Sequence, residues 1–280
     1  MRIDAHQHFW SLSRGDYGWL TPALGEIYRD FGPDDLRPLL AAHAIDRTIL
    51  VQAAPTEAET RFLLDVAART DFVAGVVGWV DFEASDTAGR IAALAADPLL
   101  VGLRPMVHDI ADDDWLTRPG LDAGFAALIG QGLVFDALLK PRHIAPMLRR
   151  LERSPGLSVV IDHAAKPDLA GGDLAHWRDG IAALARHRHV VCKLSGLVTE
   201  AGPDWTIETL APVFGHLLAC FGPERLIFGS DWPVVTLRAS YGRWAETVVA
   251  LLSPLGEGER DAIMGGTARR VYLTRRGRTG

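Results

Sequence analysis

The sequence has little cysteine, no block of basic residues and no long apolar run. Its two cysteines, Cys192 and Cys220, have apolar neighbours, so we expect small buried thiols in a reducing compartment. No apolar stretch reaches the roughly 18 residues that span a bilayer, which predicts no membrane partner. The net charge is −6 and no basic cluster is present, so we expect no nucleic-acid partner.

The sequence also lacks an export signal, an internal repeat, a linker and a low-complexity segment. The first residues pass directly into a strand pattern without a charged and then apolar leader, which predicts a cytoplasmic protein. Hydrophobic residues make up 48% of the chain and charged residues 23%, an ordinary globular composition with enough material for a core. We therefore predict a single domain over residues 1–280.

Eight short apolar segments alternate with helical patterns along the chain. The predicted strands are residues 2–5, 48–52, 73–80, 100–104, 133–139, 158–162, 190–194 and 226–229. Helical spacing of apolar residues lies between successive strands, and two more predicted helices, 241–252 and 258–272, close the chain. Strands that are apolar throughout belong to parallel sheets covered on both faces. The alternation predicts an α/β fold, a (β/α)8 TIM barrel.

A doubly wound open sheet is the alternative to the closed barrel. Such a sheet would usually have fewer strands, and no glycine-rich phosphate turn follows the first strand here. The length of 280 residues also suits a barrel, which typically has about 250 residues. These features favour the barrel.

Polar residues follow the predicted strands, where the active site of such a barrel forms. They are, in chain order, His6 and His8, Gln52, Trp79 and Asp81, Arg104, Lys140, His163, Lys193 and Ser195, and Asp231. The first and eighth strands are neighbours in a closed sheet, so we expect the three histidines and Asp231 to converge. Two imidazoles separated by one residue project from the same side of an extended chain and suit a divalent cation or a substrate carbonyl.

Each of these residues also has a purely structural interpretation. A pair of histidines arises by chance, His163 would serve as a cap or loop residue, and Asp231 would be a turn aspartate. Arg104 would be an ion-pair partner, and the two lysines would extend to solvent. An aromatic-rich tract at residues 10–22 would either cover the mouth of a pocket or cover the outside of a core.

Several motifs together resemble the amidohydrolase superfamily, specifically its amidohydrolase-2 branch. They are the His6-x-His8 pair, a histidine on a later strand, the segment 229–233 after the eighth strand and the closing segment 263–270. Longer segments, 4–10, 135–143 and 191–197, resemble sugar lactonases of the L-fucono-1,4-lactonase and L-rhamnono-lactonase group. The resemblance runs nearly end to end, and its motifs taken jointly are specific to the group.

The resemblance implies a carboxylic ester hydrolase that opens a sugar (aldono-1,4-) lactone, with L-fucono-lactone or a related L-sugar lactone as the expected substrate. Asp231 is then the expected general base, and His6, His8 and His163 either ligate a metal or donate hydrogen bonds to the oxyanion. The expected contacts to the substrate come from residues at the other strand ends, with Trp79 or Trp232 stacking on the sugar: Arg104, Lys193, Gln52, Trp79 and Trp232.

The resemblance also bears on the number of metal ions. Binuclear members of the superfamily carry a lysine at the end of the fourth strand, whereas residues 101–105 here contain none. We therefore expect one divalent ion, zinc before other metals, held by His6, His8, His163 and Asp231, or no metal at all.

Three other functions stay open at this point. A metal-dependent decarboxylase of the same branch shares the first-strand histidines and the eighth-strand aspartate. A lactonase for an aromatic-derived dicarboxylate would need several arginines at the rim, where Arg104 alone is expected. A non-catalytic sugar-binding barrel would not need a general base. The sequence leaves open the sugar, the ring size and the oligomeric state.

Overall fold

The strands of the protein form one parallel sheet in which each strand pairs with the next in sequence. The structure is a computed structural model that describes residues 1–172 and 174–274. Its strands are β1 (Ile3–Gln7), β2 (Arg47–Val51), β3 (Val73–Gly78), β4 (Leu100–Leu103), β5 (Val134–Ala137), β6 (Val159–Ile161), β7 (Val190–Leu194) and β8 (Leu226–Phe228).

The sheet closes between β1 and the segment that follows β8. Gln7 pairs in parallel with Trp232. The backbone N–H of Asp231 donates to the carbonyl of His6 at 2.7 Å, and that of His8 donates to the carbonyl of Trp232 at 2.7 Å. The predicted (β/α)8 TIM barrel is therefore confirmed, and its seam places Asp231 beside the histidines of β1.

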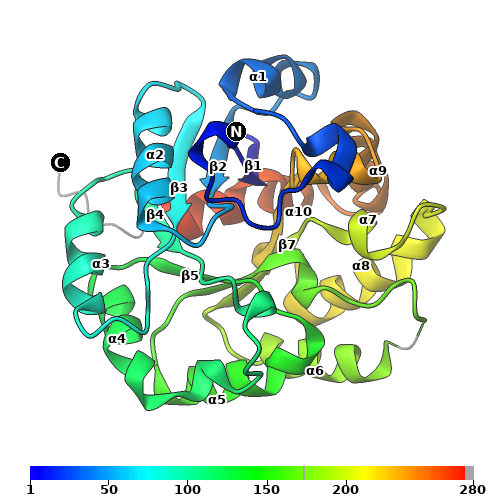
Figure 1. Cartoon of the computed structure of the whole chain (residues 1–280). Helices are drawn as coiled ribbons and strands as arrows, with labels where there is room; N and C mark the ends of the chain where they lie inside the picture. The colour runs from blue at the N-terminus through cyan, green and yellow to red at the C-terminus, as the bar shows by residue number, and fades with distance from the viewer. Residues whose placement is uncertain (173, 275–280) are drawn as a thin grey trace.

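Helices surround the sheet (Figure 1). They are α1 (Pro33–Ala42), α2 (Glu57–Ala68), α3 (Thr87–Ala95), α4 (Asp122–Gly130), α5 (Ile144–Arg153), α6 (Ala175–Ala185), α7 (Leu197–Glu200), α8 (Ile207–Phe221), α9 (Tyr241–Leu251) and α10 (Glu257–Asp261). One apolar cluster lies between strands and helices, and a smaller one fills the barrel interior with residues such as Ile3, Val51 and Tyr272. No helix within the described residues has the length and apolar character needed to cross a membrane.

The end of the chain differs from the single helix predicted for residues 258–272. The α-helix stops at Asp261 and is followed by two π-helical turns, Ala262–Gly266 and Arg269–Leu273. A β-carbon on Gly265 would lie 2.3 Å from the carbonyl oxygen of Met1, so this glycine lets the segment pack directly against the start of the chain. Close packing under the barrel, which local helix periodicity does not encode, therefore reshapes the last helix.

Candidate active site

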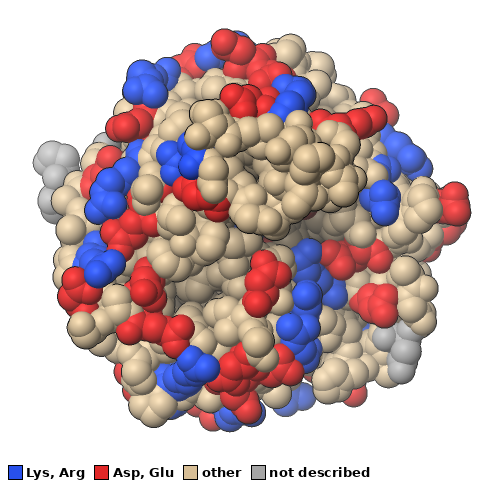
Figure 2. Space-filling view, in the orientation of Figure 1, with Lys and Arg blue, Asp and Glu red and all other residues tan. Residues whose placement is uncertain are grey.

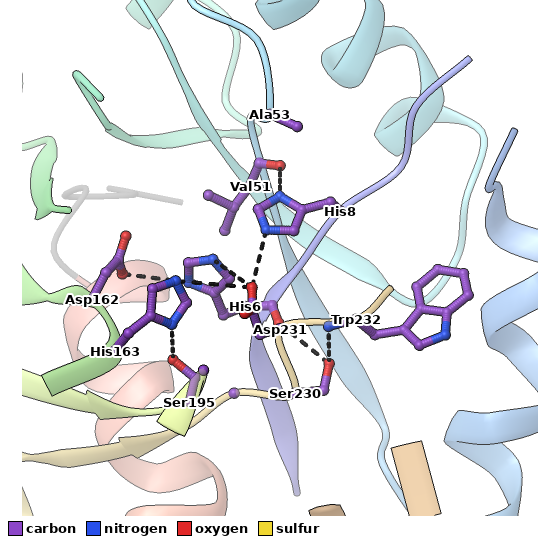
Figure 3. Close-up of polar contacts among 12 residues, drawn as sticks. His6, His8, Val51, Ala53, Asp162, His163, Ser195, Ser230, Asp231 and Trp232 are labelled. Carbon is purple, nitrogen blue, oxygen red and sulfur yellow. Dashed lines mark hydrogen bonds and ion pairs between the residues drawn. The ribbon is translucent and has the colours of Figure 1, made fainter. Parts of the chain in front are cut away.

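The carboxylate of Asp231 lies at the centre of three imidazoles (Figure 3). Its Oδ1 atom lies 3.4 Å from Nε2 of His8, 3.6 Å from Nε2 of His6 and 3.8 Å from Nε2 of His163. All four residues are buried, and the sequence places them at three different strand ends. The structure thus brings together the four residues that the barrel topology predicted to converge.

Backbone contacts at the barrel seam fix the segment that carries Asp231. The buried carboxylate of Asp4 accepts a hydrogen bond from the backbone N–H of Ser230 at 2.8 Å and another from that of His6 at 3.2 Å. A β-carbon on Gly229 would lie 2.7 Å from that of His6, so only glycine allows this close approach. The position of Asp231 relative to β1 is therefore set by its neighbours on both sides.

Two catalytic candidates have left-handed backbone conformations. The φ angle is +60° at Asp231 and +50° at His163, which begins a run of four left-handed residues that ends at Lys166. Such conformations cost a non-glycine residue about 1–2 kcal/mol each, and they concentrate at functional sites. The run turns both the His163 imidazole and the Lys166 side chain toward the same cavity.

Partner atoms orient two of the imidazoles. Nδ1 of His8 lies 2.8 Å from the carbonyl oxygen of Val51, to which it can only donate, and this hydrogen bond directs Nε2 toward Asp231. Nδ1 of His163 lies 2.9 Å from Oγ of Ser195. Supporting hydrogen bonds of this kind fix the tautomer and the plane of a metal-binding or catalytic histidine.

A buried charged layer lies beneath the histidines. The ammonium of Lys193 forms ion pairs with Asp136 and, at 3.0 Å, with Asp162, and it lies 3.3 Å from Nδ1 of His6. The hydroxyl of Tyr272 donates to the carboxylate of Asp136 at 2.8 Å. Lys193 was predicted to hold substrate hydroxyls, but its ammonium is fully buried in this layer and does not line the cavity.

Arg104 and Gln52 act as a pair. Nε2 of Gln52 donates to the carbonyl of Arg104 at 2.8 Å, and the guanidinium of Arg104 donates to the carbonyl of Gln52. Nη1 of Arg104 then lies 3.4 Å from Nε2 of His6 and 3.5 Å from the carboxylate of Asp162. Arg104 lines the cavity, whereas Gln52 is fully buried and does not line it. Gln52 is predicted to contact the substrate, but in the structure it positions Arg104 instead.

Burial sets the protonation states of the site. It lowers the pKa of His6 and of His163 well below the usual range, so both imidazoles are neutral at neutral pH. Burial alone would raise the pKa of Asp231, but interaction with His163 and the neighbouring groups lowers it below its ordinary value. Lys193 likewise outweighs burial at Asp162 and holds the pKa of that carboxyl well below its usual range. The centre therefore combines ionised carboxylates with neutral imidazoles.

A cavity of about 230 Å³ opens above this centre. Four residues from the sequence predictions line it, His8, Arg104, His163 and Asp231, together with others that include Trp19, Met106, His108, Asp109, Lys166 and Thr199. Figure 2 shows that the face in view is hollowed near its centre, with acidic and basic side chains bordering the hollow.

The two tryptophans predicted to stack on a sugar lie elsewhere. Trp232 is 3% exposed and packs edge-on against Phe9 and Phe31, within the core. Trp79 lines a neighbouring cavity and not the one above Asp231. Which way a ring points at a strand end depends on the loops packed against it, and the linear pattern does not specify that packing.

Sequence reasoning missed Trp19 and Lys166 as lining residues. The indole N–H of Trp19 donates to the carbonyl of Ala53 at 2.7 Å, which fixes the ring at the cavity wall. The aromatic tract at residues 10–22 is the sequence feature that could have indicated Trp19, and the structure places this part of the tract at the cavity mouth. Lys166, paired with Glu200 at 2.6 Å, depends on the left-handed run, which no local pattern predicts.

The donor set at the centre suits one divalent cation. His6, His163 and Asp231 each offer a ligand atom, and these atoms lie within 4.8 Å of one another. Nitrogen and carboxylate donors in this number are typical of zinc, and Nε2 of His8 faces the same carboxylate. The guanidinium of Arg104, 3.4 Å from Nε2 of His6, is a competing cation that lowers the affinity of such a site.

Comparison with known proteins agrees with this fold. The family model described as Amidohydrolase matches residues 3–273. The chain is 47% identical to the L-fucono-1,5-lactonase of Burkholderia ambifaria, with 97% of this chain and 95% of the relative aligned. It is 41% identical to the L-fucono-1,5-lactonase of Burkholderia multivorans, over 97% and 96% of the two chains.

A solved structure with bound zinc has the same fold. It is an amidohydrolase from Burkholderia multivorans that superposes with a TM-score of 0.92 at 40% identity, covering 97% of this chain and 99% of that one. The barrel and its buried His–Asp centre are thus those of a hydrolase of the amidohydrolase type. The chain belongs to the amidohydrolase family, and the predicted resemblance to its sugar lactonases is confirmed.

Proposed function

We propose that the protein hydrolyses L-fucono-1,5-lactone or a closely related L-sugar lactone to the aldonic acid. The observation that carries this proposal is the convergence of an ionised carboxylate, Asp231, with three imidazoles, of which those of His8 and His163 line a small cavity beside it. The lactonase names of the relatives at 41–47% identity supply the substrate class.

Asp231 is the proposed general base. Its lowered pKa keeps it ionised, so it can accept a proton from a water held between it and the lactone carbonyl. The hydroxide formed adds to the carbonyl carbon, the bond from this carbon to the ring oxygen breaks, and Asp231 returns its proton to that oxygen. The hydroxy acid leaves as its carboxylate and releases one proton at neutral pH.

Arg104 and the imidazoles are the proposed partners of the carbonyl oxygen. Arg104 contributes a permanent charge at the cavity wall, and Nε2 of each histidine faces the reacting region. A single divalent ion, with zinc proposed, would be held by His6, His163 and Asp231 and would polarise the carbonyl as a Lewis acid. Lys166, fixed by Glu200, is placed to bind a substrate hydroxyl.

The proposed ring size of the lactone is taken from the names of the two relatives. The motifs alone led to a 1,4-lactone, whereas both relatives are named for a 1,5-lactone, so we propose the six-membered ring as the preferred substrate. An aromatic-derived dicarboxylate is less suitable, because the described residues of the cavity lining include two cationic side chains other than histidine, Arg104 and Lys166, and Lys166 is already paired.

The test is ring opening of L-fucono-1,5-lactone and L-fucono-1,4-lactone in a pH-indicator assay. We expect the wild-type protein to prefer the 1,5-lactone, and Asp231→Asn to lose about 10²–10⁴-fold in kcat. Asp65→Asn, an exposed aspartate on α2, is the matched control and should retain full activity. Normal turnover by folded Asp231→Asn would remove Asp231 from the reaction, and carbon dioxide release from an aromatic acid would favour a decarboxylase.

A further inference from the structure

A second, larger cavity, which we call the outer cavity, lies beside the catalytic one. It measures about 480 Å³ against about 230 Å³ for the catalytic cavity. Trp19, Met106 and Asp109 line both, so the two spaces share a wall. Ligand sites commonly occupy roughly 300–1,000 Å³, a range that includes the outer cavity but not the catalytic cavity alone.

The lining of the outer cavity combines aromatic faces with carboxylates. Three tryptophans contribute, Trp19, Trp79 and Trp115, along with carboxylates from Asp16, Asp81, Glu83 and Asp109. Among the residues that the structure describes, no lysine, arginine or histidine lines it. Indole faces accept the apolar side of a flat ring, and carboxylate oxygens accept hydrogen bonds from hydroxyl groups. An anionic ligand is therefore disfavoured in this cavity.

Trp115 closes the outer cavity on the side of the core. Its side chain is 3% exposed, and its indole nitrogen is buried without a hydrogen-bond acceptor within the described chain. Because this nitrogen has no accessible surface, Trp115 lines the cavity with carbon atoms of its ring. The indole N–H of Trp19 is satisfied by a carbonyl, so this tryptophan also offers the cavity an apolar ring.

Two of the four carboxylates that line the outer cavity are neutralised by arginines. Asp16 pairs with Arg14 at 2.6 Å, and Glu83 pairs with Arg118. The imidazole of His108 lies 2.9 Å from the carboxylate of Asp109, but burial lowers the pKa of His108 to about 3, so this histidine is neutral at neutral pH and does not counter the charge. The two arginines reduce the attraction of the cavity for a cation, and the carboxylate oxygens can accept hydrogen bonds from the hydroxyl groups of a neutral ligand.

We propose that the outer cavity is a second sugar subsite that binds a neutral sugar ring next to the lactone. This proposal rests on the proposed lactone hydrolysis in the adjoining catalytic cavity. The ring is either a glycosyl group carried by the lactone itself or a separate sugar. Trp79 and Trp19 provide the stacking faces, and the carboxylates of the lining accept hydrogen bonds from hydroxyl groups of the ring.

The first experiment compares kcat/KM for L-fucono-1,5-lactone with that for the same lactone glycosylated with glucose at O-2 or O-3. The wild-type protein should favour the glycosylated lactone, and Trp79→Ala should reduce this ratio about two- to tenfold, the value of one aromatic stacking contact. The backbone N–H and carbonyl of Trp79 are held by Thr60, so the variant keeps its main-chain contacts. Tyr28→Ala, an exposed aromatic that lines neither cavity, is the control.

The second experiment measures binding of methyl α-L-fucopyranoside to the intact protein by saturation-transfer NMR. Binding that depends on Trp79 but not Tyr28 indicates a separate sugar, and a ratio that depends on Trp79 indicates a glycosylated substrate. If neither readout changes in Trp79→Ala, the subsite is disproved even though simple lactone hydrolysis stands. If neither lactone is opened, the proposed function fails, and glycoside binding still decides the subsite.

Discussion

A β-carbon on Gly196 would lie 2.4 Å from Nδ1 of His163. The φ angle of this glycine is +63°, so both its conformation and its lack of a side chain are needed where it lies. The same imidazole nitrogen lies 2.9 Å from Oγ of Ser195, the preceding residue. The residues after β7 therefore hold His163 in the orientation that turns its other nitrogen toward Asp231.

Gly196→Ala should therefore lower kcat strongly while it lowers the unfolding free energy only moderately. The left-handed conformation costs alanine about 1–2 kcal/mol of unfolding free energy. Displacing His163 by the added methyl group should lower kcat by about 10²-fold, because misplacement of a catalytic group by 1 Å has effects of that size. Lactone turnover and urea denaturation measure the two effects.

Gly156→Ala is the matched control for this prediction. Gly156 also has a left-handed φ of +88°, but a β-carbon there would meet no atom within 4 Å. The Gly156→Ala variant should lose a similar amount of unfolding free energy and keep its kcat. Equal activity losses in the two variants would show that the effect is general strain and not the position of His163.

Lys193→Met should destabilise the fold strongly. Lys193 is fully buried between Asp136 and Asp162, and removing it leaves Asp136 without a cation and Asp162 with Arg104 alone, at 3.5 Å. Breaking a buried ion pair from one side costs about 3–5 kcal/mol. The additional change Asp136→Asn should recover part of this loss, because the uncompensated carboxylate is then removed.

An exposed pair on the surface provides the comparison for Lys193. Arg37 and Asp71 lie 2.9 Å apart, with side chains 52% and 73% exposed. Arg37→Met should change the unfolding free energy by less than about 1 kcal/mol. Urea denaturation of all three variants checks the prediction, and a Lys193→Met protein as stable as Arg37→Met would contradict it.

The convergence of Asp231 with the histidines could be predicted from the sequence because it depends on topology. Once eight alternating strands close into a barrel, the ends of the first, sixth and eighth strands face one rim. The direction of Lys193 could not be predicted in this way. Its partners are Asp136 on β5, two strands away in the sheet, and Asp162 after the adjacent β6. A local sequence pattern does not indicate a pairing between different strands.

The loops were less predictable than the strands. Trp232 is held in the core by Phe9 and Phe31, which come from a segment more than 200 positions away. The four left-handed residues after β6 are neither glycine nor asparagine, so their composition gave no sign of the turn that directs Lys166 to the cavity. Tertiary packing, not local preference, decides these positions.

Zinc binding should depend on the buried centre. We expect the metal-free protein to bind one zinc ion in isothermal titration calorimetry, since His6, His163 and Asp231 offer converging ligand atoms. His163→Asn should weaken binding by more than the roughly 10–100-fold that loss of a supporting residue costs. His176→Asn, an exposed histidine on α6, is the control. Unchanged affinity in His163→Asn would place any bound zinc outside this centre.

Glu59 makes stability depend on pH through a buried carboxyl group. Burial raises its pKa from 4.5 to about 7, although the backbone N–H groups of Ala53 and Ala54 donate to it and oppose the shift. Between these two values the folded chain binds one proton more than the unfolded chain. The unfolding free energy contributed by Glu59 is therefore full below pH 4.5 and decreases as pH rises through about 7.

Glu59→Gln should remove this dependence, because glutamine keeps one acceptor for the loop after β2 but does not titrate. The stability of the wild-type protein minus that of the variant should fall by about 2–3 kcal/mol from pH 5 to pH 8, at about 1.4 kcal/mol per pKa unit. Taking the difference cancels the contribution of the buried histidines to the unfolding free energy. Their lowered pKa values act in the opposite direction, because they reduce stability as the pH falls below 6.5. Urea denaturation at both pH values measures it, and a constant difference would mean that Glu59 is already ionised in the folded protein at pH 5.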